Sequence, residues 1–434
     1  MPFAVIESVD HEGRGVTHAD GKAVFVDGAL PGEYVEYSIH RRRPGYDLAA
    51  VDRVLRPSAQ RVSPRCPSFG TCGGCSLQHL DAVAQTAVKQ RVLEDALWHI
   101  GKIRPEIVYP AIQGSAWGYR YRARLGVRLV PSKGGVRVGF HERRSSHIAD
   151  LRRCDILPTH VSAMLPRMRE LIAGLSIPDR LPQIEVAVGE AATVLVLRNL
   201  LALTVEDERQ LAAFADAHGV QMWIQPGAPE TARRLHPARA PDLTYAIPEF
   251  DVTIAFRPTD FTQVNAAINS MLIRRAMSLL DPRPGERIAD LFCGLGNFSL
   301  PIARSGSRVI GIEASQGLVE RAGENARRNG LETNCEFHAA NLFETTEDSL
   351  AALGPVTKLL IDPPREGAIA VVKAIGPGQS PQRIVYVSCN PATLARDAAV
   401  LVHQKGYVMR GAGIANMFPQ TSHVESIALF ERLS

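Results

Sequence analysis

Residues 262–434 alternate between short apolar stretches and longer amphipathic ones, and this alternation is the strongest constraint on the fold. The apolar stretches RIADLF, RVIGIE, KLLID and RIVYVS predict strands, and the stretches between them predict helices. We therefore expect a doubly wound α/β domain with a mostly parallel sheet. The last two strands, within YVMRGAGIA and VESIALFER, have no helix between them and are expected to form an antiparallel pair.

The first 58 residues have a different pattern. Apolar and polar residues alternate in four or five short stretches that glycine and proline turns separate, which predicts a small OB-like β-barrel. Such barrels often bind RNA, and the triplet Arg41–Arg43 would suit phosphate contacts, although an exposed turn explains it equally well. Residues 59–260 mix predicted strands and helices, and we expect a central α+β domain there.

Positive charge is concentrated in one segment. Residues 61–160 carry 16 basic and seven acidic side chains, whereas the whole chain has a net charge of only +4. This distribution favours a phosphate-bearing partner, but a solvated basic face would have the same composition. Arg120, Arg122 and Arg124 alternate along one predicted strand, so we expect them to share a face and to contact phosphates.

The chain has seven cysteines and no run of about 18 apolar residues, so we expect no membrane span. The first residues, MPFAVIESVDHEGRG, lack a basic segment followed by an apolar run, and we therefore expect no export signal. An odd number of cysteines without such a signal predicts a cytoplasmic protein whose cysteines act as ligands or nucleophiles.

Three motifs follow predicted strands, at the edge where such sheets bind ligands. DLFCGLGNF (290–298) is a glycine turn, and Glu313 ends the next strand, as expected for binding the ribose of a dinucleotide or of S-adenosylmethionine. IDPPREGA (361–368) places Asp362 at a strand end. VSCNPATLARD (387–397) places Cys389 directly before a helix, whose N-terminus is expected to lower the thiol pKa and favour a nucleophilic thiolate.

Four further cysteines form a candidate metal site. Three of them lie close together between glycines in PRCPSFGTCGGCS, and the fourth is distant; they are Cys66, Cys72, Cys75 and Cys154. Four thiolates suit an iron–sulfur cluster or zinc, and the spacing alone does not choose between them.

Taken together, these motifs resemble the RNA 5-methyluridine methyltransferase family, and within it the branch that acts on 23S ribosomal RNA. FTQVN (261–265) and FPQTSHVES (418–426) add to the resemblance, which covers nearly the whole chain. The barrel and the cysteine loop argue against the transfer-RNA branch. Asn416 and Gln420 depart from the family's pattern, in which an acid often precedes Met-Phe-Pro and His can occur directly after it.

The resemblance implies three domains. It implies a TRAM domain at 1–58, a central domain with an iron–sulfur loop at 59–260, and a class I, Rossmann-like S-adenosylmethionine methyltransferase domain at 261–434. Part of the segment 93–118 is expected to pack on the catalytic domain. The implied partner is 23S ribosomal RNA, and we expect a monomer.

The resemblance also implies a role for each candidate residue. Cys389 would add to carbon 6 of a flipped uracil and so activate carbon 5, and Glu425 would then remove the carbon 5 proton. The implied cofactor contacts are Gln263, Phe292, Asn297, Glu313, Asn341 and Asp362, of which Gln263 and Asp362 could also touch the uracil. The implied [4Fe–4S] ligands are Cys66, Cys72, Cys75 and Cys154. The target uridine, and whether one or two sites are modified, are not implied.

Two other classes of protein fit parts of the sequence. An amino-group methyltransferase also uses an Asp-Pro-Pro turn, but it needs neither Cys389 nor Glu425. A non-catalytic RNA-binding or redox-sensing protein would need only the cysteine set. A covalent adduct with 5-fluorouridine RNA would exclude the first, and S-adenosylmethionine turnover on unmodified ribosomal RNA would exclude the second.

Overall fold

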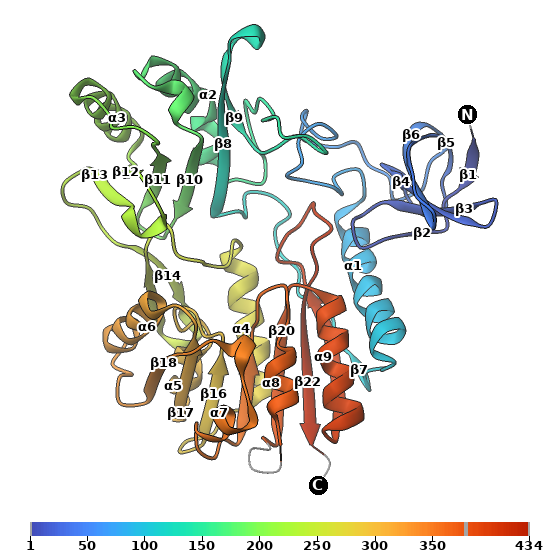
Figure 1. The fold of residues 1–434 in the computed structure, drawn as a ribbon, viewed down its shortest axis with the longest axis vertical. Helices are drawn as coiled ribbons and strands as arrows, with labels where there is room; N and C mark the ends of the chain where they lie inside the picture. Colours follow the sequence, from blue (N-terminus) through green and yellow to red (C-terminus); the bar gives the residue numbers. More distant parts are fainter. Residues whose placement is uncertain (1, 377–380, 433–434) are drawn as a thin grey trace.

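The computed structural model of the protein describes residues 2–376 and 381–432, which form three large sheets and a separate hairpin (Figure 1). The N-terminal sheet, in blue, and the green central sheet lie at one end of the molecule. The eight-stranded C-terminal sheet lies at the other end. Within the described residues, no helix has both the length and the apolar character needed to cross a membrane.

The N-terminal sheet is a closed barrel of six strands. Two of these strands, β1 and β2, are short and follow each other along residues 3–9. β1 pairs with β5 and β2 pairs with β3, and β5 and β3 are the two edges of the sheet that β3, β4, β5 and β6 form. The sheet therefore closes on itself around a small apolar core. The strands are β1 (Phe3–Val5), β2 (Ser8–Val9), β3 (Gly15–Ala19), β4 (Lys22–Asp27), β5 (Tyr34–Arg42) and β6 (Tyr46–Arg56).

The central sheet has the order β13-β12-β11-β10-β8-β9 and packs against two helices. β8 and β9 form an antiparallel hairpin around residues 132–135, and β13 is a short strand at the other edge of the sheet. Its elements are β8 (Arg122–Val130), β9 (Gly135–Gly139), α2 (Thr159–Gly174), β10 (Gln183–Val188), β11 (Thr193–Arg198), α3 (Val205–His218), β12 (Gln221–Gln225) and β13 (Arg233–His236).

The C-terminal sheet confirms the predicted α/β alternation and the antiparallel last pair. Its order is β18-β17-β16-β19-β20-β22-β21-β7, with β22 inserted antiparallel between β20 and β21. β7, which lies within the 93–118 segment, adds in parallel to the edge strand β21. The strands are β7 (Ile107–Val108), β16 (Arg287–Leu291), β17 (Arg308–Glu313), β18 (Cys335–Ala339), β19 (Lys358–Ile361), β20 (Arg383–Ser388), β21 (Tyr407–Ala415) and β22 (Glu425–Arg432).

Helices cover both faces of this sheet. One face packs against α1 (Ala82–Ala96), α7 (Glu347–Ala351), α8 (Ile369–Ala374) and α9 (Pro391–Gln404). The other face packs against α4 (Ala266–Leu280), α5 (Ser299–Arg304), α6 (Gln316–Arg328) and the hairpin of β14 (Leu243–Ile247) and β15 (Val252–Phe256). The hairpin therefore packs against the C-terminal sheet, although it lies before residue 261, the predicted start of that domain. The domain limits at 58 and 260 stay predictions.

A buried ion pair ties the barrel to the segment that follows it. Glu33 is fully buried and accepts hydrogen bonds from Arg61 through Nε at 2.5 Å and through Nη2 at 2.7 Å. It also accepts from the backbone N–H groups of Leu30 and Ser58. Burial raises the pKa of the Glu33 carboxyl, but these hydrogen bonds, led by Arg61, outweigh burial and the pKa is lowered overall.

Arg61→Ala is expected to destabilise the barrel by about 3–5 kcal/mol, because it leaves the Glu33 carboxylate buried without its cation. Hydrogen exchange of the β3–β6 amides would measure the loss as a lower free energy of local opening. The matched control is Arg53→Ala, since Arg53 is exposed and lies 3.8 Å from Glu36; its expected cost is at most about 1 kcal/mol. Equal effects of the two substitutions would contradict this account.

Candidate active site

One large cavity, of about 1350 Å³, opens beyond the carboxyl ends of the parallel strands. Its wall brings together the ends of β16, β17, β19 and β20 and the connection between β21 and β22. The barrel also contributes, through Arg14 and Arg41, and the central domain contributes Arg120. Seven of the eight predicted catalytic and cofactor residues line this cavity; they are Gln263, Phe292, Asn297, Glu313, Asp362, Cys389 and Glu425.

The glycine turn after β16 forms one end of the cavity. Phe292, Gly294 and Gly296 all have positive φ angles of 65°, 54° and 91°, a conformation that glycine adopts freely and phenylalanine rarely. The backbone N–H of Gly294 donates to the Glu313 carboxylate at 3.2 Å, and Ser315 N–H donates to its other oxygen at 3.0 Å. Glu313 is thus held beside the turn, as a ribose-binding carboxylate must be.

A polar network that the sequence analysis missed fixes Asn297. The Asn297 side chain exchanges two hydrogen bonds with Asn269 of α4, at 2.9 and 3.0 Å, and accepts a third from the Tyr245 hydroxyl at 2.9 Å. Tyr245 and Asn269 lie in a hairpin and a helix without a recognisable motif, so only the fold reveals them.

The structure does not bring Asn341 into the cavity wall. Its side chain accepts a hydrogen bond from Phe343 N–H at 3.1 Å and caps the short 3₁₀ turn Leu342–Glu344. Leu342 and Phe343 line the cavity instead, and the Phe343 ring lies 5.8 Å from that of Phe292. The two rings are tilted by 58° and contribute apolar wall next to the glycine turn.

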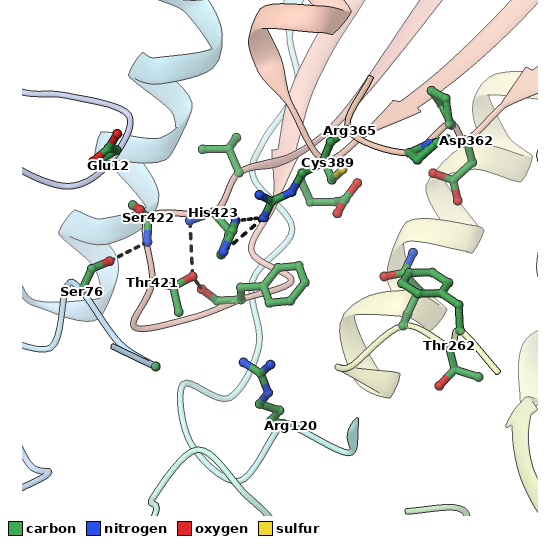
Figure 2. A pocket seen from close by; sticks show the side chains of 18 of the residues that line it. Glu12, Ser76, Arg120, Thr262, Asp362, Arg365, Cys389, Thr421, Ser422 and His423 are labelled. Atoms are coloured by element: carbon green, nitrogen blue, oxygen red, sulfur yellow. Dashed lines mark hydrogen bonds between the residues drawn. The ribbon is translucent and has the colours of Figure 1, made fainter. Parts of the chain in front are cut away.

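Cys389 and Glu425 meet because β20 and β22 are antiparallel neighbours. The register pairs Ser388 with Ser426, so the next positions, Cys389 and Glu425, stand opposite each other at the strand ends. Figure 2 shows Cys389 close to Arg365, with Asp362 on the same side of the cavity. Arg365 also donates to the ring of His423 at 3.1 Å.

Burial controls the protonation of these groups. Burial raises the pKa of the Asp362 carboxyl to about 7, and burial together with the nearby Asp362 raises that of Glu425 well above its usual range. Asp290, which the sequence analysis did not single out, is fully buried, and burial raises its pKa to about 7 despite a hydrogen bond from Ser299. Its second carboxylate oxygen has no partner.

The expectation that the α9 N-terminus lowers the Cys389 pKa is wrong for the protein alone. Burial, together with the carboxyl groups of Glu425 and Asp362, raises the pKa of the thiol to about 11, although Arg365 lowers it. Desolvation and two like charges outweigh the helix terminus, whose effect is confined to its first turn.

The three arginines expected to share a face have different surroundings, and their phosphate contacts stay a prediction. Arg122 and Arg124 do face the same way along β8, but Glu185 of β10 accepts a hydrogen bond from Arg124 at 3.0 Å. The Arg122 side chain is mostly buried, 3.9 Å from Glu185. Only Arg120, whose guanidinium lies 5.3 Å from the Phe140 ring centre, lines the cavity.

The four cysteines of the candidate metal site converge on one small cavity, together with Phe69, Phe140 and Ile156. Burial raises the pKa of Cys75 to about 11 and of Cys154 to about 12. Among the described residues, no three His, Cys, Asp or Glu side chains are grouped as around a single metal ion. A four-iron cluster takes one thiolate on each iron, so it needs a wider arrangement than one ion does.

Comparisons with known proteins agree with this architecture. The TRAM domain matches residues 4–51, and the tRNA (Uracil-5-)-methyltransferase family matches residues 242–433. The structure of tRNA (uracil-54, C5)-methyltransferase from Pyrococcus abyssi, solved with S-adenosyl-L-homocysteine, covers 99% of this chain and 100% of its own, with a TM-score of 0.74 and 22% identity. Since that fold spans the whole chain, the barrel alone does not separate this chain from the transfer-RNA branch.

Sequence relatives are much closer. A 23S rRNA (uracil(1939)-C(5))-methyltransferase of Aromatoleum aromaticum is 74% identical over 432 residues, which is 100% of both chains. That of Nitrosospira multiformis is 60% identical over 99% of this chain and 98% of its own. Identity at this level over the full length shows that the chain is a methyltransferase that belongs to the 23S rRNA (uracil-C5)-methyltransferase family.

Proposed function

We propose that this protein methylates carbon 5 of a uridine in 23S ribosomal RNA, through a covalent bond between Cys389 and carbon 6 of the base. The observation that carries the proposal is the β20–β22 register, which sets a thiol and a buried carboxyl opposite each other at one cavity wall. An amino-group methyltransferase has no use for that pair. The names of the close relatives support the ribosomal substrate and the uracil carbon.

The residues at the other end of the cavity fit S-adenosylmethionine, which supplies a methyl group on a positively charged sulfur. Glu313 would hold the ribose, and the rings of Phe292 and Phe343 would hold the adenine. Asn297 and Asp362 would face the remainder of the cofactor, and Gln263 lies where it could contact either cofactor or uracil. Asn341 would contribute only from the rim.

The chemistry needs a thiolate nucleophile and a base. The Cys389 thiolate adds to carbon 6 of uracil, and the resulting enolate carries the negative charge toward carbon 5. Carbon 5 takes the methyl group, and Glu425 then removes the carbon 5 proton. The electron pair of that C–H bond restores the 5,6 double bond, and Cys389 leaves as a thiolate. Arg365 is the cation that lowers the thiol pKa. Because Cys389 is partly buried in the cavity wall, the uridine must leave its stack to reach it.

Cys389→Ala is expected to abolish methylation and every covalent adduct, since no enolate can form. Glu425→Gln keeps the shape but not the base, so a methylated RNA–protein adduct should accumulate and appear as a slow band on a denaturing gel. Its turnover should fall by about 10²–10⁴-fold. Transcripts of 23S RNA and of transfer RNA, compared as substrates, test the RNA class. Wild-type turnover by Glu425→Gln with no adduct would exclude Glu425 as the base.

The raised thiol pKa predicts slow alkylation of Cys389 at neutral pH in the absence of RNA. The rate should rise with pH toward about 11, the value that burial and the two carboxyls produce. Glu425→Gln removes a like charge, so the rise should move to lower pH. Iodoacetamide labelling followed by mass spectrometry measures the rate, with Cys389→Ala as the background. An unchanged profile in Glu425→Gln would show that the two groups do not interact.

We also propose that Cys66, Cys72, Cys75 and Cys154 hold a [4Fe–4S] cluster, which their shared cavity supports. Protein purified without oxygen should contain about four irons per chain and absorb visible light as such clusters do. Cys154→Ser should lose the iron, whereas Cys335→Ser, at a cysteine outside the set, should keep it. Stoichiometric zinc without iron would contradict the assignment.

A further inference from the structure

The connection between β21 and β22, residues 416–424, determines where Glu425 stands. It leaves β21 after Ala415 and returns directly into Glu425, the first residue of β22. Its residues Phe418, Thr421, Ser422 and His423 line the large cavity. A shift of this connection would therefore move the carboxyl group opposite Cys389.

Gln420, near the middle of the connection, has a backbone conformation that a residue of its type rarely adopts. Its φ angle is 68°, in the left-handed region. Such backbone conformations persist where several contacts with the surrounding structure hold them in place, often next to functional sites. Gln420 is 3% exposed, so its polar groups need partners within the protein.

Gln85 of α1 supplies two of those partners. Its side-chain oxygen accepts from Gln420 N–H at 2.9 Å, and its amide nitrogen donates to the Gln420 side-chain oxygen at 3.0 Å. The Gln420 carbonyl oxygen accepts from the backbone N–H groups of Ser76 and Leu77, at 2.9 and 3.0 Å. Figure 2 shows the neighbouring contact, in which Ser422 N–H donates to the Ser76 hydroxyl at 2.9 Å.

Lys89, one turn further along α1, holds the beginning of the connection. Its ammonium group is 1% exposed and donates to the Asn416 side-chain oxygen at 2.7 Å and to the Phe418 carbonyl oxygen at 2.9 Å. A lysine is seldom buried this completely without a carboxylate, and here both acceptors are neutral oxygens of the connection. Burial alone lowers its pKa to about 7.

The same lysine acts on the cavity through His423. Burial, together with the charges of Arg365, Lys89 and Arg120, lowers the pKa of His423 to about 4. A neutral His423 ring can accept the hydrogen bond from Arg365, the cation beside Cys389. The centre of the ring lies 5.3 Å from that of the Phe418 ring, at a tilt of 49°, and the Phe418 carbonyl oxygen accepts from Lys89.

We propose that Gln85 and Lys89 are positioning residues for the reaction: they lock the 416–424 connection so that Glu425 stands opposite Cys389. The proposal rests on the function proposed above, in which Glu425 is the base that releases the adduct. In this proposal, α1 holds the 416–424 connection in place in addition to packing on α9.

Lys89→Met in the full-length protein is the main test, because methionine fills similar space and donates no hydrogen bond. Elimination should slow by about 10–100-fold, as misplacement of a reacting group by about 1 Å would cause. Methylated adduct on Cys389 should therefore accumulate on unmodified 23S transcript. Dissociation constants for RNA and for S-adenosylmethionine should change by less than about threefold. A merely structural role would lower the melting temperature without changing the ratio of adduct to product.

Arg91→Met is the matched control on the same helix, because its side chain is exposed and pairs only with Asp95; its adduct ratio should equal that of the wild type. Should Lys89→Met fail to fold, Asn416→Ala tests the same contact from the other side. Asn416→Asp, which keeps an acceptor for Lys89, should return the adduct ratio toward the wild-type value.

Two outcomes would overturn the positioning proposal. One is a wild-type adduct ratio in folded Lys89→Met and Asn416→Ala. The other is a loss of RNA or cofactor affinity with an unchanged ratio. Glu425→Gln separates this failure from failure of the proposed function: if it accumulates adduct while Lys89→Met does not, only the positioning proposal is wrong. If neither Glu425→Gln nor the wild type ever forms an adduct, the proposed mechanism itself fails.

Discussion

The insertion of β22 between β20 and β21 is the constraint on which the active site depends. A purely parallel sheet would bring only strand ends of one direction to the cavity, each followed by a helix. Because β22 runs the other way, its first residue, Glu425, lies opposite the position directly after β20, which is Cys389. In this arrangement the connection from β21 to β22, residues 416–424, contains no helix. Its conformation therefore depends on contacts with neighbouring elements. The structure uses α1 and the cysteine loop for that purpose.

The sequence was sufficient for features that repeat or that lie at strand ends. Strand and helix periodicity predicted the α/β sheet and its antiparallel last pair, and the strand-end rule placed Glu313, Asp362 and Cys389 on one cavity. It was insufficient where a partner is distant in the chain. Nothing local to Arg122 or Arg124 shows that Glu185 faces them, and the hydrogen bonds from α1 to the 416–424 connection span more than 300 residues.

Burial is the second property that local sequence did not predict. Cys389 precedes a helix, which in isolation favours a thiolate, yet in the folded chain two carboxyl groups and the loss of water favour the thiol. The position of the Asn341 side chain could not be predicted from local sequence either. It follows the third parallel strand as expected, but its own backbone turn engages its side chain and leaves the cavity wall to Leu342 and Phe343.

The carboxyl groups at the cavity connect its two ends. Burial raises the pKa of the Asp362 carboxyl to about 7, and burial together with Asp362 raises that of Glu425 well above its usual range. A sulfonium bound near Asp362 would favour its ionised form. Since like charges also couple Asp362 to Glu425 and to Cys389, a bound methyl donor would alter the protonation of both residues at the uracil end. Under the proposed function, cofactor binding and the protonation of Cys389 and Glu425 would therefore be linked through the Asp362 carboxylate.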